Sequence, residues 1–499
     1  MRAIFLFLIL TALAFSTFAQ AARVPIATPP APVFTDRERQ TELAKRRAQV
    51  AAQMADNSVL VLFSAEPKMY TGDVDYVFRQ ENDLFYLTEL KEQNISLVIE
   101  KKNGKVTETV YLPKRDPRFE TWNGKRYSVD DAKRISGINN VVDAAGFAGY
   151  LNSLAKGSSE SVYLLLPDGD QDAEGKREYR QEAAFAATAT VKTVNARPIF
   201  DDLRQIKSPF ELKLLQHAID ISIEGHMRAW ATAGRASWEY EVQAELEYVF
   251  KRRNADYWGY PSIVGCGPNA TTLHYEESQS PAKAGELMLI DAAAEYSHYS
   301  ADITRTFPIN GKYSKEQADI YQIVYDAQEA AAKTVKPGST FADASVAAAK
   351  VISEGLFKLG LVTDPNSQEF RIWYMHGLGH WIGMNVHDVG SYTKPLAPGM
   401  VFTIEPGIYI RADALDYLPD TPKAKEFKAK VMPAFEKYKN IGVRIEDDVL
   451  VTPTGIDWLS KRLPRTMKEI EDFMKVAPKN VPFGSLRPAL FPYSSRSGE

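Results

Sequence analysis

The chain has 499 residues, of which 45% are hydrophobic and 25% charged, and its formal net charge is -4 at pH 7. This length predicts two domains, because a single hydrophobic core rarely grows beyond about 250–300 residues. The composition is that of a globular protein, and the small negative charge gives no reason to expect a nucleic acid or an anionic membrane surface as a partner.

The first 21 residues have the pattern of a secretory signal peptide. Arg2 precedes an apolar run from Ala3 to Phe15, and Ala19-Gln20-Ala21 fits an A-x-A cleavage site. The run is too short to span a membrane comfortably, and no Cys follows it that could carry a lipid. We therefore expect an exported protein, periplasmic or secreted, with no stable membrane insertion after the signal is removed. Cleavage after Ala19 and an uncleaved anchor are the alternatives.

Residues 22–34 contain four prolines and predict an extended spacer. The region that follows, residues 35–204, has the mixed pattern of an α/β domain. Asp36 is placed to cap a charged helix that runs to about Ala55. Asn103-Gly104 lies between two apolar runs, which is a strong signal for a two-residue hairpin. The predicted strands of this region are Val59–Phe63, Ser96–Glu100, Val106–Leu112 and Ser161–Leu166.

A second domain, residues 205–465, begins with a helix signal. Ser208-Pro209-Phe210-Glu211 is a capping box with Pro at the first helical position, and Gly234 is placed to end this helix. Another helix is predicted from Trp238 to Arg253. Residues 466–499 form a C-terminal segment with a last helix, Met467–Met474, and a proline-rich irregular tail.

The only cysteine is Cys266, which excludes an internal disulfide. No base adjoins it in the sequence that could activate the thiol. The residue is therefore expected to pack in the interior rather than to act as a nucleophile.

Three of the seven histidines, His376, His380 and His387, fall within twelve residues of one glycine-rich stretch. Histidine is the commonest metal ligand, and glycine lets a backbone approach its neighbours closely. This combination indicates a functional site. The alternative is a glycine-rich turn with incidental histidines.

Four acids stand at or inside apolar runs on either side of the histidine cluster, namely Asp291, Asp302, Glu405 and Glu446. A strand over residues 286–291 and another over residues 299–307 predict a hairpin with Asp291 and Asp302 on one face. A buried carboxylate is costly unless it is paired, so each acid could instead belong to a buried salt bridge. Four such acids in one half of the chain favour a shared site.

Charge counting supports a pair of metal ions at this site. The four acids carry four negative charges, which two divalent cations would neutralise, and one imidazole and a bridging hydroxide would complete the shells. Oxygen-rich coordination with one nitrogen suits Mn2+, with Co2+, Fe2+ or Zn2+ as alternatives. No cysteine-rich tetrahedral set is present, so a structural zinc site is not expected.

At this point the sequence resembles the pita-bread metallopeptidases and, within them, the aminopeptidase P (Xaa-Pro aminopeptidase) family. In the first half the resemblance rests on Phe78-Arg-Gln-Glu-Asn-Asp-Leu-Phe-Tyr-Leu-Thr and on Glu120-Thr-Trp122-Asn-Gly. The matching motifs of the second half are Tyr260-Pro-Ser-Ile-Val-Gly, Leu273-His274-Tyr-Glu, Asp291-Ala-Ala-Ala-Glu-Tyr, Ser300-Ala-Asp302-Ile-Thr-Arg, His376-Gly-Leu-Gly-His380-Trp, Val386-His387-Asp-Val-Gly, Ile404-Glu405-Pro-Gly and Arg444-Ile-Glu446-Asp-Asp.

The resemblance implies a role for each of these residues. Asp302 and Glu446 would bridge both metals, and Glu405 would be both a ligand and the proton acceptor for the attacking water. The implied metal ligands are Asp291, Asp302, His380, Glu405 and Glu446. The implied catalytic residues are Glu405, His274, His387 and His376. The implied substrate-binding residues are Tyr260, His376 and Arg444.

The resemblance also implies the fold and the assembly. The fold class would be α+β, with a curved antiparallel sheet backed by helices in the catalytic domain and a smaller α/β domain before it. Relatives are often dimers or tetramers, so a homo-oligomer is expected, and Trp122 would reach the site of a neighbouring subunit.

The implied activity is removal of the N-terminal residue from peptides with proline in the second position. One alternative is a prolidase, which takes only the free Xaa-Pro dipeptide and shares the catalytic core. A less favoured alternative is a non-catalytic pita-bread module that binds peptides. Such modules usually lose metal ligands, and none of the five positions is lost here.

Overall fold

The computed structural model describes residues 26–169, 171–477 and 481. The expected signal peptide and nearly all of the irregular tail lie outside the described residues. The chain divides into two compact units at residue 210. One unit, here called the N-terminal unit, spans Ala31–Phe210, and the other, here called the catalytic unit, comprises Glu211–Glu499 together with Met1–Pro30.

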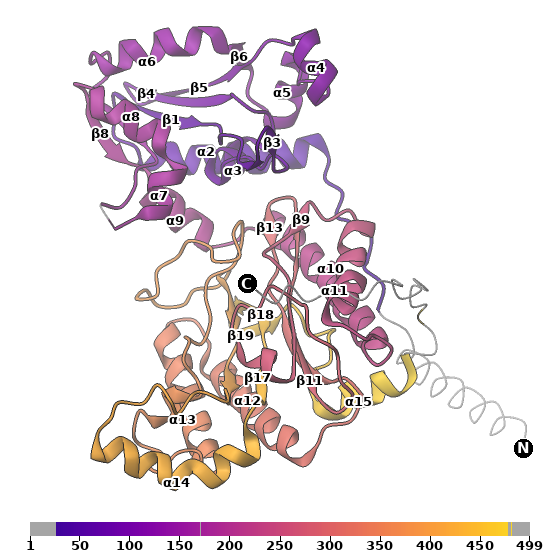
Figure 1. Ribbon diagram of the computed structural model, residues 1–499. Helices are drawn as coiled ribbons and strands as arrows, with labels where there is room; N and C mark the ends of the chain where they lie inside the picture. The colour runs from indigo at the N-terminus through magenta and orange to yellow at the C-terminus, as the bar shows by residue number, and fades with distance from the viewer. Residues whose placement is uncertain (1–25, 170, 478–480, 482–499) are drawn as a thin grey trace, which may run out of the picture. The chain divides into compact units, whose positions relative to one another are not determined.

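The N-terminal unit is built on a six-stranded sheet with the order β6-β5-β4-β1-β7-β8. The strand β1 pairs antiparallel with β4 and parallel with β7, so the sheet is mixed. Helices cover both of its faces, with α6 on one side and α2 and α3 on the other (Figure 1). The strands of the sheet are β1 (Ser58–Phe63), β4 (Ser96–Lys102), β5 (Lys105–Leu112), β6 (Asn140–Asp143), β7 (Ser161–Leu164) and β8 (Lys192–Asn195).

The hairpin of β4 and β5 forms where the sequence predicts it. Asn103 and Gly104 both have positive φ, 51° and 72°, as a type I′ turn requires. The helix predicted from Asp36 is α2, but its N-cap is Thr35 rather than Asp36. The hydroxyl of Thr35 accepts a hydrogen bond from the backbone N–H of Glu38, and the Glu38 carboxylate returns to the Thr35 N–H. This reciprocal pair satisfies two of the free donors at the helix start.

Eight helices of the N-terminal unit are described, and a small hairpin lies outside the main sheet. The helices are α2 (Asp36–Gln53), α3 (Asn82–Thr88), α4 (Pro117–Asn123), α5 (Val129–Ser136), α6 (Phe147–Ala155), α7 (Ala173–Glu178), α8 (Arg180–Thr188) and α9 (Arg197–Gln205). The hairpin consists of β2 (Met69–Thr71) and β3 (Val74–Asp75). The unit is therefore a small α/β domain.

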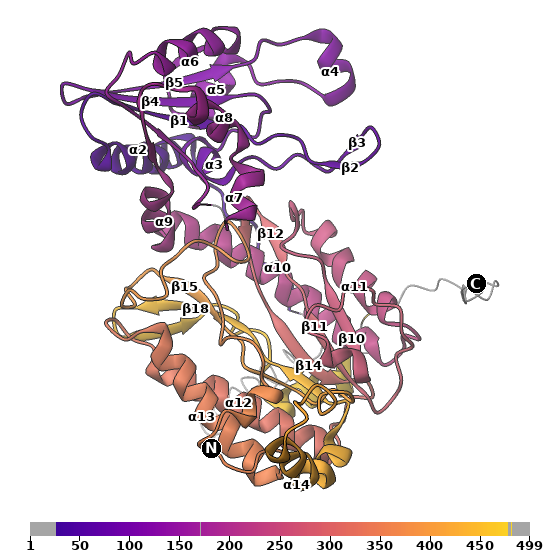
Figure 2. The same ribbon diagram turned by 60° about the vertical axis from the view of Figure 1, so that its left-hand side comes forward.

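The catalytic unit places short antiparallel strands between two pairs of helices. The pair α10 and α11 lies on one side of the strands, and the pair α12 and α13 lies on the other (Figure 2). Helix α10 starts at Pro209, as the capping box predicts, and it ends at Ala233, directly before Gly234. The helices are α10 (Pro209–Ala233), α11 (Glu239–Arg252), α12 (Lys315–Thr334), α13 (Phe341–Leu359), α14 (Pro422–Tyr438) and α15 (Met467–Val476).

All strand pairs of the catalytic unit are antiparallel in the described residues. The predicted strand over residues 299–307 is wrong in its continuity, because it divides into β13 and β14, and the apolar run around Glu446 likewise divides into β17 and β18. The strands are β9 (Tyr257–Trp258), β10 (Ile263–Cys266), β11 (Leu287–Asp291), β12 (Ala294–Tyr296), β13 (Tyr299–Ser300), β14 (Thr304–Pro308), β15 (Val401–Ile404), β16 (Gly407–Tyr409), β17 (Gly442–Arg444), β18 (Asp447–Thr452) and β19 (Gly455–Trp458).

The proline-rich segment before α2 is partly tied to the catalytic unit. The backbone N–H of Thr28 donates to the Glu224 carboxylate of α10 at 2.7 Å, and its hydroxyl donates to the same oxygen at 2.5 Å. The first described residues of this spacer are therefore held against α10 by these hydrogen bonds. Within the described residues, no helix combines the length and the apolar character that crossing a membrane demands.

Candidate metal centre and active site

The four acids of the predicted site lie where strands end or break. Asp291 is the last residue of β11, and Glu405 directly follows β15. Asp302 lies in the gap between β13 and β14, and Glu446 lies in the gap between β17 and β18. A side chain at a strand end is free of the ladder's alternation, so the four carboxylates can turn toward one point. These interruptions explain why the predicted strand over residues 299–307 and the apolar run around Glu446 are not continuous strands.

Backbone pairing around Thr304 brings three of the four segments together. Thr304 is the ladder partner of Asp291 in the pairing of β11 with β14. Its carbonyl accepts a hydrogen bond from the N–H of Glu446 at 3.0 Å, and its hydroxyl donates to Oε2 of Glu446 at 2.6 Å. Asp302 stands two residues before Thr304, and its Oδ1 and that of Asp291 both lie 2.5 Å from the Tyr260 hydroxyl, so the two side chains face the same point.

His380 reaches the acids from the glycine-rich loop between α13 and β15. Its N–H donates to the Thr403 hydroxyl at 3.0 Å, and the Thr403 N–H donates to its carbonyl at 2.9 Å, so the loop is fastened to β15. A Cβ on Gly379 would collide with the Thr403 carbonyl oxygen, so this close approach requires glycine. The glycines of the motif therefore position the histidine, as the sequence suggested.

The imidazole Nε2 of His380 faces three carboxylates. It lies 3.2 Å from Oδ2 of Asp302, 3.3 Å from Oε1 of Glu405 and 3.9 Å from Oε1 of Glu446. Its Nδ1 lies 3.2 Å from the Trp381 carbonyl oxygen, which fixes Nδ1 as the protonated nitrogen when the ring is neutral. The lone pair of Nε2 then points at three anionic groups, which is unfavourable unless a cation lies between them.

The donor atoms of this group fit a divalent metal ion. Ligand atoms of Asp302, His380 and Glu446 all lie within 4.8 Å of one another. Glu446 is only 1% exposed, and its buried Oε1 has no hydrogen-bond partner among the described residues. A buried carboxylate oxygen without a donor is costly, and a metal ion would satisfy it. Oxygen donors with one imidazole nitrogen are typical ligands of Mn2+ and similar ions.

The electrostatics of the acids lead to the same conclusion. Burial, followed by the charges of the neighbouring acids, raises the pKa values of Asp302, Glu405 and Glu446 well above their usual range. The group must hold either protons or cations, because like charges this close are unstable together.

Tyr260 was predicted to bind substrate, and its hydroxyl contacts two of the four acids. The oxygen is 2.5 Å from Oδ1 of Asp291 and 2.5 Å from Oδ1 of Asp302. Burial and these two charges raise the pKa of Tyr260 well above its usual value, so the hydroxyl keeps its proton. A single O–H can donate to one acid at a time, which leaves the other in need of a partner.

Arg444 was also predicted to bind substrate, and its guanidinium is already engaged. It pairs with Oδ2 of Asp291 at 2.5 Å and donates to the hydroxyls of Tyr409 at 2.8 Å and Thr304 at 3.2 Å. The side chain is 4% exposed. Arg444 therefore holds Asp291 and Tyr409 in place at the wall of the site.

His376 continues this chain of contacts. Its Nε2 lies 2.8 Å from the Tyr409 hydroxyl, and its Nδ1 lies 2.8 Å from the Gly377 carbonyl. Burial, with the nearby Arg444 charge, lowers the pKa of His376 to about 3, so the ring is neutral near pH 7. The Tyr409 hydroxyl then accepts from Arg444 and donates to His376. Tyr409 was missed as a site residue, although it stands two residues after the Ile404-Glu405-Pro-Gly motif of the sequence.

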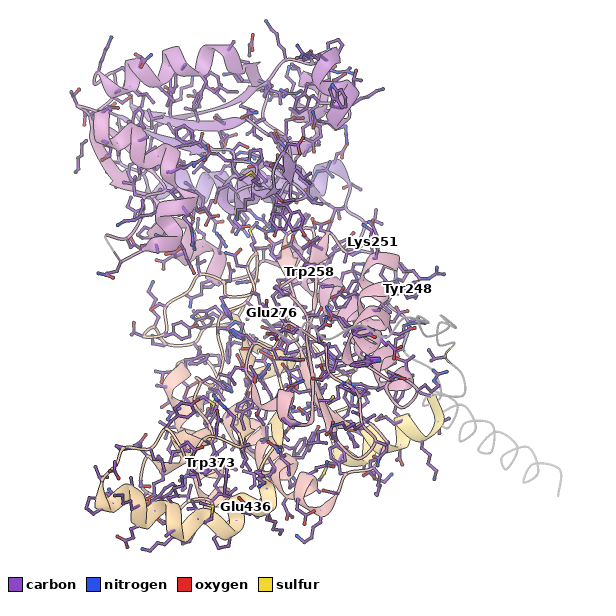
Figure 3. The ribbon with its side chains drawn as sticks, in the orientation of Figure 1. Tyr248, Lys251, Trp258, Glu276, Trp373 and Glu436 are labelled. Carbon is purple, nitrogen blue, oxygen red and sulfur yellow. The ribbon has the colours of Figure 1, made fainter. Side chains whose placement is uncertain are left out.

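One pocket of about 320 Å³ contains the whole set. Trp258 and Glu276 mark the region of the catalytic unit around it in Figure 3, and Glu276 lines the pocket. The ring of His387 stands 4.2 Å from that of His380 at 77°, while His274 is exposed at the wall. Apolar walls not predicted from the sequence come from Ile263, Leu273 and Val386. The predicted residues in the lining are Tyr260, His274, Asp291, Asp302, His376, His380, His387, Glu405, Arg444 and Glu446.

Cys266 is 2% exposed at the end of β10, and its thiol lies 3.3 Å from the Pro281 carbonyl oxygen. Burial, with the charge of Glu239, raises the pKa of the thiol far above its usual value. The thiol therefore stays protonated and packs in the interior, as expected.

Comparison with known proteins gives consistent matches. Residues 213–453 match the model of metallopeptidase family M24, and residues 43–163 match that of the aminopeptidase P N-terminal domain. An Xaa-Pro aminopeptidase of Haemophilus influenzae is 37% identical over 444 residues, which are 87% of this chain and 97% of the relative. An Xaa-Pro aminopeptidase of Escherichia coli is 32% identical and covers 88% of this chain and 98% of its own.

Solved structures agree with the sequence matches. Aminopeptidase P from E. coli in its low-pH form superposes with a TM-score of 0.78 at 32% identity, covering 90% of this chain and all of the other. Pseudomonas aeruginosa aminopeptidase PepP gives a TM-score of 0.77 at 35% identity, covering 88% and 99%. The expected fold class is thereby confirmed, with a pita-bread catalytic domain preceded by a smaller α/β domain.

Proposed function

Since the chain belongs to metallopeptidase family M24, with the N-terminal domain of aminopeptidase P, we propose that it is an Xaa-Pro aminopeptidase. Such an enzyme removes the first residue from peptides whose second residue is proline. The observation that carries the proposal is the convergence of His380 on Asp302, Glu405 and Glu446 in one pocket. The relatives that match over nearly their whole length are Xaa-Pro aminopeptidases by name.

We propose that the site takes two divalent metal ions, most favourably Mn2+. The support is the charge balance, because four carboxylates and a hydroxide carry five negative charges, which Arg444 and two divalent ions would balance. Asp291, Asp302, His380, Glu405 and Glu446 would hold the pair, with Asp302 and Glu446 shared between the ions. When bound, such ions supply Lewis-acid activation of a water molecule near neutral pH.

Glu405 is suited to take the proton of the attacking water. Its side chain is 15% exposed, against 6% for Asp302 and 2% for Glu446, so it is the most accessible of these three acids. The Thr403 hydroxyl donates to its Oε1 at 3.2 Å and holds that oxygen toward His380. The other oxygen, Oε2, lies 3.9 Å from Nδ1 of His376, beyond hydrogen-bonding distance, and would accept the proton.

The histidines around Glu405 would serve the substrate. His387 would donate to the oxygen anion that develops on the attacked carbonyl, and His274 would assist the leaving nitrogen. Neutral His376 and the ring of Tyr260 would form a wall against which the proline packs. A neutral wall fits the proline ring, because an apolar ring gains from leaving water and a charged wall would keep water in place.

Two expectations about the cell and the assembly remain proposals. We propose export through a signal peptide at residues 1–21, which sequencing the N-terminus of the mature protein would test. We propose a homo-oligomer in which Trp122, 83% exposed on α4, reaches the site of a neighbouring subunit. Helix α4 and the β2–β3 hairpin project from the same side of the N-terminal unit (Figure 2). The hairpin segment exposes Met69, Tyr70, Val74, Tyr76 and Val77, and light scattering would give the oligomeric state.

The activity is tested with a short peptide panel. After chelator treatment and reloading with Mn2+, the enzyme should release the first residue from Xaa-Pro-Yaa and leave Xaa-Ala-Yaa nearly intact. Hydrolysis of the Xaa-Pro dipeptide alone would indicate a prolidase. If no peptide is cleaved and no Mn2+ is retained, the proposal is wrong and the binding-module alternative gains support.

A further inference from the structure

Gln328 of α12 is a fully buried amide behind the metal site that touches the backbone of two proposed ligand segments. It is 0% exposed. Its Nε2 lies 2.9 Å from the carbonyl oxygen of Ile404 and 3.1 Å from that of Ile445. Each carbonyl belongs to the residue directly before a carboxylate of the site, Glu405 in one case and Glu446 in the other. The side chain does not line the pocket.

The same nitrogen also contacts the acid that follows the second ligand. Nε2 of Gln328 lies 3.0 Å from Oδ2 of Asp447, whose other oxygen pairs with Arg305 at 2.6 Å. The side chains of Asp447 and Arg305 are both 0% exposed. One amide group therefore joins β15, the break before β18 and a buried ion pair to a single point on a helix.

The orientation of the Gln328 amide is determined by Arg465. Nη1 of Arg465 donates to Oε1 of Gln328 at 2.9 Å, and arginine can only donate. The oxygen must therefore face Arg465, and the NH2 group must face the three acceptors. Arg465 is itself held by Glu329 at 2.8 Å and by the ring of Trp458, 4.0 Å below its guanidinium.

The carbonyl groups of Ile404 and Ile445 lie where the strand ladder no longer holds the two ligand segments together. The ladder of β15 with β18 ends at the pair Ile404 and Asp447, so Glu405 and Glu446 lie beyond its last rung. At this end of the ladder, the amide of Gln328 contacts the carbonyl oxygens of Ile404 and Ile445 at once, and so touches both ligand segments. Ligand carboxylates in metal sites depend on such supporting hydrogen bonds for their position, and loss of the support typically costs about 10- to 100-fold in metal affinity.

We propose that Gln328 is a positioning residue that holds Glu405 and Glu446 at the separation the metal site needs. This inference rests on the proposed metallopeptidase function. The residue acts through the main chain and touches neither substrate nor metal. A donor is essential at this place, because a carboxylate would set a fourth oxygen against the oxygens of Ile404, Ile445 and Asp447.

The test compares three variants of the full chain. Gln328→Met keeps the volume and removes all four contacts, while Gln328→Glu keeps an acceptor for Arg465 and removes the donors. Gln317→Met is the matched control, since Gln317 lies on the same helix, is 8% exposed and donates from Nε2 to the Gly285 carbonyl at 2.8 Å. Gly285 precedes the end of β11 that is remote from Asp291.

Mn2+ affinity by chelator competition and the visible absorption of bound Co2+ are the readouts, with circular dichroism and urea unfolding as checks on the fold. Both Gln328 variants should bind Mn2+ about 10- to 100-fold more weakly and shift the Co2+ absorption, while Gln317→Met changes only stability. At saturating Mn2+, kcat should fall with KM for the peptide within about twofold.

Unchanged Mn2+ affinity and Co2+ absorption in both Gln328 variants would overturn the proposal. A loss confined to Gln328→Met would also overturn it, because the effect would then belong to the Arg465 contact. If one Gln328 variant does not fold, the Mn2+ affinity of the other Gln328 variant decides. An equal loss of Mn2+ affinity in Gln317→Met would show that the effect comes from lower overall stability, which would also overturn the proposal. If the wild type binds Mn2+ but cleaves no Xaa-Pro-Yaa peptide, the proposed function fails and the affinity comparison still stands.

Discussion

Each unit buries carboxylates, but the N-terminal unit pairs the buried Asp83 with a cation, whereas the predicted site of the catalytic unit leaves three of its four acids without one. In the N-terminal unit, Arg204 pairs with Asp83 at 2.8 Å, and the two side chains are 4% and 3% exposed. In the catalytic unit, Arg444 pairs with Asp291, while Asp302, Glu405 and Glu446 have no Lys or Arg partner among the described residues. The first arrangement is electrically complete, and the second is complete only when protons or bound cations neutralise the acids.

A third arrangement in the N-terminal unit uses a proton. Glu182 of α8 is 2% exposed, and its Oε2 has no hydrogen-bond partner. Burial, with smaller effects of Glu178 and Glu66, raises the pKa of Glu182 to about 8. This carboxyl is isolated, so protonation resolves its charge. The acids of the catalytic unit instead converge with an imidazole, which is the feature that separates a metal site from a merely buried acid.

The largest expected effect comes from removing a shared ligand of the metal site. Asp302→Asn should lower kcat/KM for Xaa-Pro-Yaa at least about a thousandfold, because the amide removes a charge and a donor oxygen from the site. Elemental analysis should show less than the wild-type metal content. Without metal, the variant should be at least as stable as the wild type, since one of the repelling acids is gone.

Asp326→Asn is the control for this variant. Asp326 is exposed on α12 and accepts a hydrogen bond from Gln322 at 2.8 Å, so its loss removes a charge far from the acids. Full activity of Asp302→Asn, or equal metal loss in the control, would contradict the assignment of Asp302.

Removing the cation of the N-terminal pair should have the opposite consequence. Arg204→Met leaves the buried Asp83 uncompensated and should lower the free energy of unfolding by about 3–5 kcal/mol, with metal content unchanged. Urea unfolding measures the loss. Arg134→Met is the control, because Arg134 and Asp131 form a surface pair that is 54% and 45% exposed, and its loss should change stability by less than about 1 kcal/mol. Equal effects of the two variants would show that the Asp83 pair is not structural.

The sequence predicted the site better than it predicted the elements that carry it. Each proposed ligand acid stands at or inside an apolar run, and such an acid is expensive to bury without a partner. The pattern could not show that Asp302 and Glu446 lie in gaps between strands, because a gap depends on pairing with segments more than 100 residues away. The continuous strand predicted around Asp302 was wrong for this reason.

The supporting residues behind the site could not be predicted from local pattern. Gln328 lies in an ordinary amphipathic helix, and its partners, Ile404 and Ile445, lie 76 and 117 residues further along the chain. Trp373 is similarly buried, its ring 6.0 Å from that of Phe435 of α14 (Figure 3), and its carbonyl accepts from the N–H of Tyr409 at 2.8 Å. Such contacts become visible only when the fold brings distant segments together.

The smallest expected effect concerns the protonated acid of the N-terminal unit. The pKa of Glu182 is about 8 in the folded protein, against about 4.3 for an unfolded glutamate. Between these two values the folded protein binds a proton that the unfolded chain has released. Stability therefore falls as the pH rises through this window, and the penalty is complete above pH 8. Below about pH 4 both states are protonated and the residue contributes no pH dependence.

Glu182→Gln should remove this decline, because the amide is neutral at every pH and nearly the same size as the protonated acid. The variant should match the wild type near pH 4 and exceed its free energy of unfolding by about 2 kcal/mol at pH 6, since each pH unit above the unfolded pKa costs the wild type about 1.4 kcal/mol. Urea unfolding at pH 4, 6 and 8 measures the difference, with Glu174→Gln, at an exposed position of α7, as the control. If Glu182→Gln keeps the slope of the wild type between pH 5 and 8, the acid is ionised in the folded protein. The distinction between an acid neutralised by a proton and acids held for a metal would then fail in the N-terminal unit.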